Sequence, residues 1–167
     1  MHESYEPIVR EDIPAITRVM KRAFDDDSQR HLGVPEGGPP GYDDGSFFEK
    51  WLFGQQATHG IKMMVDGRIV GAAIVWVFSN HQNYLGTIFI DPEYQNRGLG
   101  SAFWRHIEQT WPETAVWQLE TPAFATRNHH FYEKTCGFAL AGRHREEGEE
   151  HDSLVFRKAM RPEQSEQ

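Results

Sequence analysis

Apolar residues recur with a helical period in the first third of the chain. The residues that share this spacing are Ile13, Ile16, Val19, Met20 and Phe24, and they predict a helix over about 12–24. The acidic run Asp25–Asp27 is expected to end it. Ile8–Val9 is expected to form a short strand before this helix, while a glycine- and proline-rich loop at 33–45 and a short helix at 46–53 follow it.

The middle of the chain changes to the two-residue period that is typical of strands. Residues 61–65 alternate, 69–78 are apolar on both faces, and 84–90 are rich in β-branched and aromatic residues, so three strands are expected. Asp66-Gly67 predicts a hairpin turn between the first two strands. A helical period returns after Gly98, and Trp111-Pro112 closes that helix.

Strand and helix signals alternate through the rest of the chain. We expect a strand at 115–119, a short helix at 128–135 that stops at Gly137, and two closing strands at 138–143 and 153–158. This order predicts a single α/β domain over 1–167, with its core at about 5–160. Its sheet is expected to be mixed and mostly antiparallel, with helices on both faces.

Composition narrows the class of protein. Hydrophobic residues make up 38% of the chain and aromatic residues 13%, which is enough for a buried core. The formal net charge of −8 argues against a nucleic-acid binder, because such a protein needs a basic face. A cationic partner fits this charge better, although acidity also serves solubility alone.

The cysteine, the histidines and the apolar segments indicate the cellular compartment and whether a metal site is expected. The single cysteine, Cys136, excludes an internal disulfide framework and indicates a reducing, cytoplasmic compartment. The N-terminus has no signal-peptide pattern, and the longest apolar run, 69–78, is about half the length that spans a bilayer, so no membrane segment is expected. The adjacent His129 and His130 would point about 100° apart on a helix and chelate poorly, so no metal site is expected.

The richest chemical signal lies at 88–101, where a strand runs into a polar, glycine-containing turn and then into an amphipathic helix. A helix N-terminus offers unpaired N–H groups and a positive dipole end, and glycines let the backbone approach an anion. The pattern predicts a phosphate or pyrophosphate site, with Arg97 as an added cation. A dinucleotide fingerprint would need a third glycine where Phe103 stands, and a P-loop would need a lysine after Gly100; neither is present.

The turn Gln95-Asn96-Arg97-Gly98-Leu99-Gly100, with Phe131-Tyr132-Glu133-Lys134 and Gly137-Phe138 downstream, resembles the GNAT acyltransferase superfamily over about 5–160. The resemblance implies a GNAT-like fold and an enzyme that moves an acetyl group from acetyl-coenzyme A (acetyl-CoA) to a primary amine by direct aminolysis of the thioester. The acceptor would be a small molecule or a protein amine, and exposed C-terminal strands could pair two copies as a homodimer. A catalytically silent acyl-CoA sensor of the same fold stays open as an alternative.

The resemblance also implies roles for individual residues. Backbone N–H groups of the turn would hold the pyrophosphate, and the matching residues are Gln95, Asn96, Arg97, Gly98, Leu99, Gly100 and Ser101. The backbone of Ile88, Phe89 and Ile90 would pair with the pantetheine arm, and Tyr132 would protonate the departing thiolate. Many relatives place an asparagine where Ala125 stands, so Asn128 is either a further cofactor ligand or a helix N-cap.

The sequence does not identify the general base that would deprotonate the amine. Keeping a lysine-like amine neutral at pH 7 costs about 4.6 kcal/mol, because its pKa is near 10.4. Some relatives carry a glutamate in the strand before the turn, but 84–90 contains no acidic residue. The remaining candidates for this base are His81, Asp91, Glu93 and Glu120. For each of them the alternative interpretation is a charged surface residue without a catalytic role. The loop at 33–45, with Glu36, Tyr42, Asp43 and Asp44, would line the acceptor pocket or be a mobile solvent loop.

Overall fold

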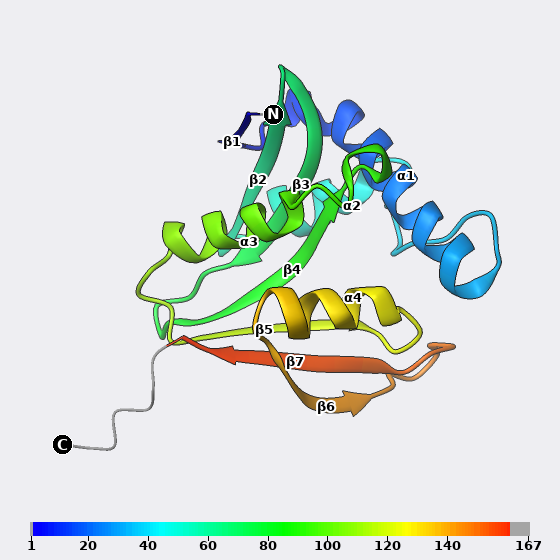
Figure 1. Cartoon of the computed structure of the whole chain (residues 1–167), viewed down its shortest axis with the longest axis vertical. Coiled ribbons are helices and arrows are strands. Elements are labelled where there is room, and N and C mark those ends of the chain that lie inside the picture. The colour runs from blue at the N-terminus through cyan, green and yellow to red at the C-terminus, as the bar shows by residue number, and fades with distance from the viewer. Residues whose placement is uncertain (1, 161–167) are drawn as a thin grey trace.

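A seven-stranded sheet in the order β1-β2-β3-β4-β5-β7-β6 forms the centre of the computed structural model, which describes residues 2–160 (Figure 1). The strands are β1 (Glu3–Pro7), β2 (Thr58–Val65), β3 (Arg68–Trp76), β4 (Gln82–Ile90), β5 (Val116–Pro122), β6 (Ala139–His144) and β7 (Ser153–Ala159). All neighbouring strands are antiparallel except β4 and β5, which are parallel. The predicted α/β class, with a mixed and mostly antiparallel sheet, is confirmed.

Helices cover both faces of the sheet, as expected. The longer helices are α1 (Ile13–Leu32) and α3 (Leu99–Thr110); the shorter are α2 (Ser46–Phe48), continued by η2 (Glu49–Phe53), α4 (Thr126–His130), continued by η4 (Phe131–Thr135), and the single turns η1 (Arg10–Asp12) and η3 (Pro92–Tyr94). One core lies between the sheet and α1 and α2, and a second lies between the sheet, α3 and α4 (Figure 1). None of the helices within 2–160 is long and apolar enough to cross a membrane.

The first helix is longer than the sequence predicts. It continues through Asp25–Asp27 to Leu32 and ends at Gly33, whose φ of 69° is left-handed. The acidic run does not stop it, because its carboxylates find cations one turn away: Lys21 lies 2.6 Å from Asp25. The first strand is also displaced, since β1 ends at Pro7, before the predicted Ile8–Val9.

The sheet opens between β4 and β5. Their parallel pairing runs from Gln82 with Val116 to Leu85 with Leu119 and then stops, although β4 continues to Ile90. The divergence begins at Gly86, which is the extra residue of a β-bulge against β3. Among residues 2–160, the backbone edge of β4 from Gly86 to Ile90 therefore has no strand partner on the β5 side, and this opening leads to the glycine turn.

Candidate functional site

The glycine turn joins the end of β4 to α3 and presents free backbone donors. Asn96 and Gly98 have left-handed φ values of 63° and 77°, and Gly98 is the N-cap of α3. The first intrahelical bond runs from the Ala102 N–H to the Gly98 carbonyl at 3.1 Å. Within the described chain, the N–H groups of residues 96–101 donate to no other residue. Donors gathered at the positive end of a helix form an anion site.

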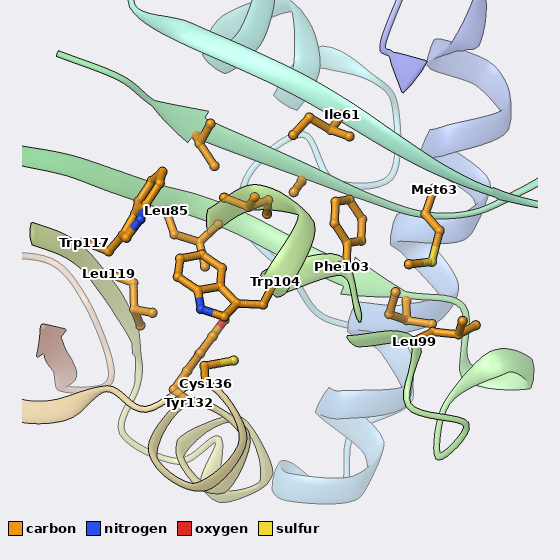
Figure 2. Close-up of a cluster of buried hydrophobic side chains, with 14 of the residues drawn as sticks. Ile61, Met63, Leu85, Leu99, Phe103, Trp104, Trp117, Leu119, Tyr132 and Cys136 are labelled. Atoms are coloured by element: carbon orange, nitrogen blue, oxygen red, sulfur yellow. The ribbon is translucent and has the colours of Figure 1, made fainter. Parts of the chain in front are cut away.

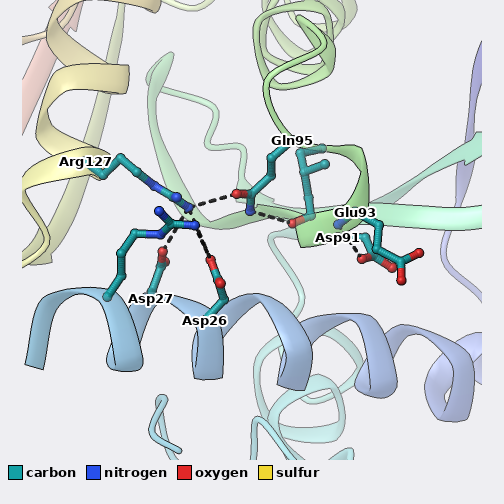
Figure 3. A network of polar contacts seen from close by, with 8 residues as sticks. Asp26, Asp27, Asp91, Glu93, Gln95 and Arg127 are labelled. Atoms are coloured by element: carbon teal, nitrogen blue, oxygen red, sulfur yellow. Dashed lines mark hydrogen bonds and ion pairs between the residues drawn. The ribbon is translucent and has the colours of Figure 1, made fainter. Parts of the chain in front are cut away.

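The side chains of Gln95 and Arg97 help to hold the shape of this turn, and Figure 3 shows the contacts of Gln95. The Gln95 amide donates to the Ile90 carbonyl at 3.1 Å and accepts from Arg127 at 2.9 Å. Arg97 donates to the Glu93 carbonyl at 2.9 Å, and its guanidinium lies 5.2 Å from the Tyr94 ring centroid. The Gln95 N–H points to the Pro92 carbonyl at 3.4 Å, so the free donors begin at Asn96.

The three strand residues before the turn fill the two cores with their side chains. Phe89 packs on the α1 face, whereas Ile88 and Ile90 pack on the α3 face. Only their backbone groups are left to face the opening beside β4, which is what pairing with an extended chain requires. The structure thus places the open strand edge directly before the free donors of the turn, from Ile88 to Ser101.

Tyr132 lies on the α4 side of the sheet, in the core under α3 and α4. Its ring is buried and points from η4 toward Trp104 (Figure 2). Burial, with smaller contributions from Cys136, Asp27 and Tyr84, raises the pKa of the Tyr132 hydroxyl above its ordinary value. The hydroxyl makes no hydrogen bond within residues 2–160. It is therefore a neutral phenol with a free proton, near Tyr84 of β4.

A second polar group lies on the opposite face of the sheet. Leu119 and Leu85 point into the α3 core, so alternation directs Glu120 and Tyr84 toward the α1 face. The Tyr84 hydroxyl donates to Glu120 at 3.3 Å, and His144 of β6 lies 2.9 Å from the other carboxylate oxygen. Burial and the neighbouring Glu120 raise the pKa of Tyr84, which keeps it protonated as a donor.

Aromatic rings continue this polar group along the α1 face. The ring centroids of Trp76 and Tyr84 are 6.3 Å apart, and those of Trp51 and Trp76 are 6.0 Å apart. Aromatic faces beside a carboxylate attract a cation. The arrangement can receive an ammonium group at the opening between β4 and β5, on the side of the sheet opposite Tyr132.

The other predicted base candidates have different surroundings. Asp91 is 2% exposed, pairs with Arg22 and accepts from the Glu93 N–H at 3.1 Å, so it braces the end of β4. Glu93 lies in η3, beside the turn. His81 lies just before β4, at the end opposite the turn. Of the four candidates, Glu120 is the one that the fold brings to the opening.

Asn128 and the acceptor loop also have defined places. Asn128 lies inside α4, whose N-cap is Ala125, so the N-cap alternative for Asn128 is wrong; a role toward the cofactor stays a prediction. In the 33–45 loop, Tyr42 is buried, Glu36 lies 3.0 Å from Lys21 and Asp44 accepts from the Ser46 N–H at 2.9 Å. These loop residues are held by their own neighbours.

Sequence reasoning did not single out Arg127 or Tyr84. Arg127 bonds to Gln95, 32 positions away in the sequence, and to Asp27 of α1, 100 positions away. Tyr84 bonds to Glu120, 36 positions away. No local spacing connects such residues. Across residues 2–160, no three His, Cys, Asp or Glu side chains are grouped in a way that could hold a metal ion.

Comparisons with known proteins agree with this geometry. A model of the Acetyltransferase (GNAT) family matches residues 17–138. The ribosomal-protein-S18-alanine N-acetyltransferase from Escherichia coli superimposes with a TM-score of 0.74 at 19% identity, covering 99% of each chain. The PaiA N-acetyltransferase from Thermoplasma acidophilum, solved in complex with coenzyme A, gives a TM-score of 0.71 at 14% identity, over 95% of this chain and 99% of that one.

A curated relative is closer in sequence but covers less of the chain. It is the uncharacterized protein YrkN of Bacillus subtilis, 40% identical over 80 residues, which are 47% of this chain and 43% of that protein. The chain thus matches less than half the length of this relative. The family match, by contrast, spans most of the chain, including β4, the glycine turn and η4. The chain therefore belongs to the GNAT family of acetyltransferases, whose acetyl donor is acetyl-CoA.

Proposed function

We propose that the chain is an N-acetyltransferase that moves the acetyl group of acetyl-CoA to a primary amine by direct aminolysis of the thioester. The observation that carries this proposal is the continuity between the open edge of β4 and the free N–H groups of residues 96–101. In this proposal those N–H groups hold the pyrophosphate, and the backbone of Ile88–Ile90 pairs with the pantetheine arm. The cosubstrate supplies an activated acetyl thioester.

Tyr132 is the proposed acid. A general acid must hold its proton at neutral pH, and the raised pKa of the buried phenol ensures this. Free phenol is a weaker acid than a free thiol, with pKa values near 10 and 8.5. Desolvation raises both in the same direction, so a thiolate released beside Tyr132 is itself made more basic. Burial therefore keeps the phenol protonated and shifts donor and acceptor in the same direction, so it does not by itself oppose the proton transfer.

Glu120 is the proposed carboxylate on the acceptor side. It lies on the opposite face of the sheet from Tyr132, at the opening, with Tyr84 and His144 on its two oxygens. There it would bind the acceptor ammonium and take its proton, which reduces the cost of about 4.6 kcal/mol for a neutral amine at pH 7. Trp76 and Trp51 would border the approach of the cation.

The acceptor class is proposed from charge. The net charge of −8 favours a cationic acceptor, and four of the carboxylates behind it, those of Glu146, Glu147, Glu149 and Glu150, are exposed in the β6–β7 loop. A protein amine or a small molecule with more than one amine satisfies this requirement. Pairing of two copies through the outer strand β6, whose Leu140 is 57% exposed, and a cytoplasmic location stay predictions.

A thiol-release assay tests the proposed function. The protein is mixed with acetyl-CoA and with polyamines, aminoglycosides, amino acids or lysine peptides, and free thiol is followed. Thiol release that depends on an amine, with acetylated product found by mass spectrometry, is expected. Binding of acetyl-CoA without release for any amine would instead favour a catalytically silent sensor.

A further inference from the structure

Arg127 joins three parts of the molecule beside the glycine turn (Figure 3). Its guanidinium donates to the Gln95 side chain at 2.9 Å and to Asp27 of α1 at 3.2 Å, and it lies 3.7 Å from Asp26. Arg127 belongs to α4, so one side chain connects α1, α4 and the first residue of the turn. Its side chain is 36% exposed, which leaves it accessible to a ligand.

The turn's own cation, the exposed Arg97, is one guanidinium among several nearby carboxylates. A pyrophosphate at residues 96–101 would lie near Asp26, Asp27, Asp91 and Glu93, of which Asp91 is paired with Arg22. Arg97 bonds back to the Glu93 carbonyl and stacks on Tyr94. Without a further cation, the backbone dipoles and the single charge of Arg97 would have to outweigh this acidic surrounding. Arg127 is the guanidinium already bonded to a side chain of the turn.

We propose that Arg127 is a cofactor-binding residue that exchanges partners: Asp26 and Asp27 hold its guanidinium in the free protein, and the phosphates of CoA take it over on binding. The inference rests on the proposed pyrophosphate site at residues 96–101. A partly exposed ion pair is weak, whereas a guanidinium bonds two phosphate oxygens at once, so the exchange is favourable. Gln95 keeps Arg127 within reach of the turn in the free state.

Calorimetric titration with CoA and with S-acetylpantetheine, which lacks the phosphates, tests the exchange. Arg127→Gln should weaken CoA binding about 10- to 100-fold and leave S-acetylpantetheine binding unchanged, because a charged hydrogen-bonding partner of the phosphates is lost. The matched control is Arg30→Gln, which removes a cation that also pairs with Asp26, at 3.4 Å, without touching the turn. It should change CoA affinity less than about twofold.

A second variant tests the release of Arg127. Asp27→Asn removes a competing carboxylate, so it should strengthen CoA binding in the wild-type background. In Arg127→Gln the gain should be smaller, because there it only relieves the repulsion between Asp27 and the phosphates. Arg127→Lys keeps a charge but loses the planar fork, so it should bind CoA with intermediate affinity. Circular dichroism and thermal melting of the free protein show whether Arg127→Gln folds. If it does not, Arg127→Lys is used for the comparison of CoA with S-acetylpantetheine.

The outcomes separate this inference from the proposed function. Equal losses for CoA and S-acetylpantetheine would make Arg127 a structural brace and overturn the inference. Unchanged or tighter CoA binding by Arg127→Gln would overturn it as well, as would an Asp27→Asn protein that binds CoA no better than wild type. Wild-type protein that binds no CoA would overturn the proposed cofactor site itself.

Discussion

At the scale of single residues, burial decides what each candidate group can do. Cys136 is 3% exposed, and burial raises the pKa of its thiol to about 12, so it stays protonated and is a core residue, as its sequence context indicates. Tyr132 is buried too, but its hydroxyl has no hydrogen-bond partner within residues 2–160. Burial thus keeps both groups protonated at neutral pH, and only the proposed function gives the proton of Tyr132 a role.

Tyr132→Phe should lower kcat about 100-fold or more and leave CoA affinity unchanged, since it removes only the proposed proton donor. Stability should change little, because the hydroxyl bonds to no residue in the described chain. Steady-state kinetics and calorimetry measure the two quantities. Tyr5→Phe is the control, because that buried hydroxyl also has no hydrogen-bond partner among residues 2–160 and lies in β1, at the far edge of the sheet from β5. An unchanged kcat in Tyr132→Phe would remove Tyr132 from the mechanism.

Glu120→Gln should lower kcat/KM for the amine at pH 7 by about 10- to 100-fold, since the amine then has to lose its proton to solvent. Activity should recover as pH rises toward the amine pKa near 10.4, because the free amine becomes abundant. A pH series of kcat/KM measures this, with the exposed Glu113→Gln as control. A pH profile identical to that of wild type would contradict the role of Glu120.

At the scale of elements, the glycine turn depends on backbone conformation more than on side chains. Gly98 has a φ of 77° and open space around its Cα, which a side chain could fill only at the cost of left-handed strain. Gly100 has a different requirement: a Cβ there would lie 3.1 Å from Phe131 of η4. Gly98 allows the left-handed backbone of the turn, and Gly100 allows α3 to pack closely against Phe131 of η4.

Gly98→Val should abolish CoA binding, because a β-branched residue disfavours the left-handed conformation that directs the N–H groups outward. Gly67→Val is a matched control, since Gly67 has the same φ of 77° and equally open space in the β2–β3 hairpin. Both variants should lose comparable stability in thermal melts, but only Gly98→Val should lose CoA binding by calorimetry. Normal affinity in folded Gly98→Val would refute the pyrophosphate assignment.

At the scale of the whole molecule, the opening between β4 and β5 has to be bridged. Strand pairing across it covers only the start of both strands, from Gln82 to Leu85 on β4. Aromatic packing completes the connection: the Trp104 ring of α3 lies 5.3 Å from that of Trp117 in β5 and 5.2 Å from that of Phe138. The core under α3 and α4 therefore joins the two parts of the sheet while the edge of β4 stays open (Figure 2).

Trp104→Ala should lower the free energy of unfolding by about 3–5 kcal/mol, as expected for a large aromatic residue removed from a core. Trp104 is 2% exposed, whereas Phe78 is 41% exposed, so Phe78→Ala should cost less than about 0.5 kcal/mol. Urea denaturation of both variants measures the difference. Equal losses would contradict the bridging role of Trp104.

The sequence by itself determined the parts of this protein that depend on neighbouring residues. The hydrophobic periods located the strands and helices, the Asp66-Gly67 turn forms with left-handed φ values of 50° and 77°, and the glycine turn opens α3 as predicted. These features are local, because they depend on backbone preferences and on spacing within a few residues. Their order along the chain was enough to indicate the fold class, and the motifs of the glycine turn and of residues 131–138 carried the resemblance to the family.

Only the tertiary structure decided which distant groups meet. Asp25–Asp27 continue α1 instead of ending it, because cations from the same helix and from α4 neutralise them. Glu120 was one candidate among four until strand alternation and the opening beside β4 set it next to Tyr84 and His144. Arg127 meets Gln95 and Asp27 across 32 and 100 positions. Charge pairing and desolvation act through space, so the identity of the partners follows from the fold and not from spacing along the chain.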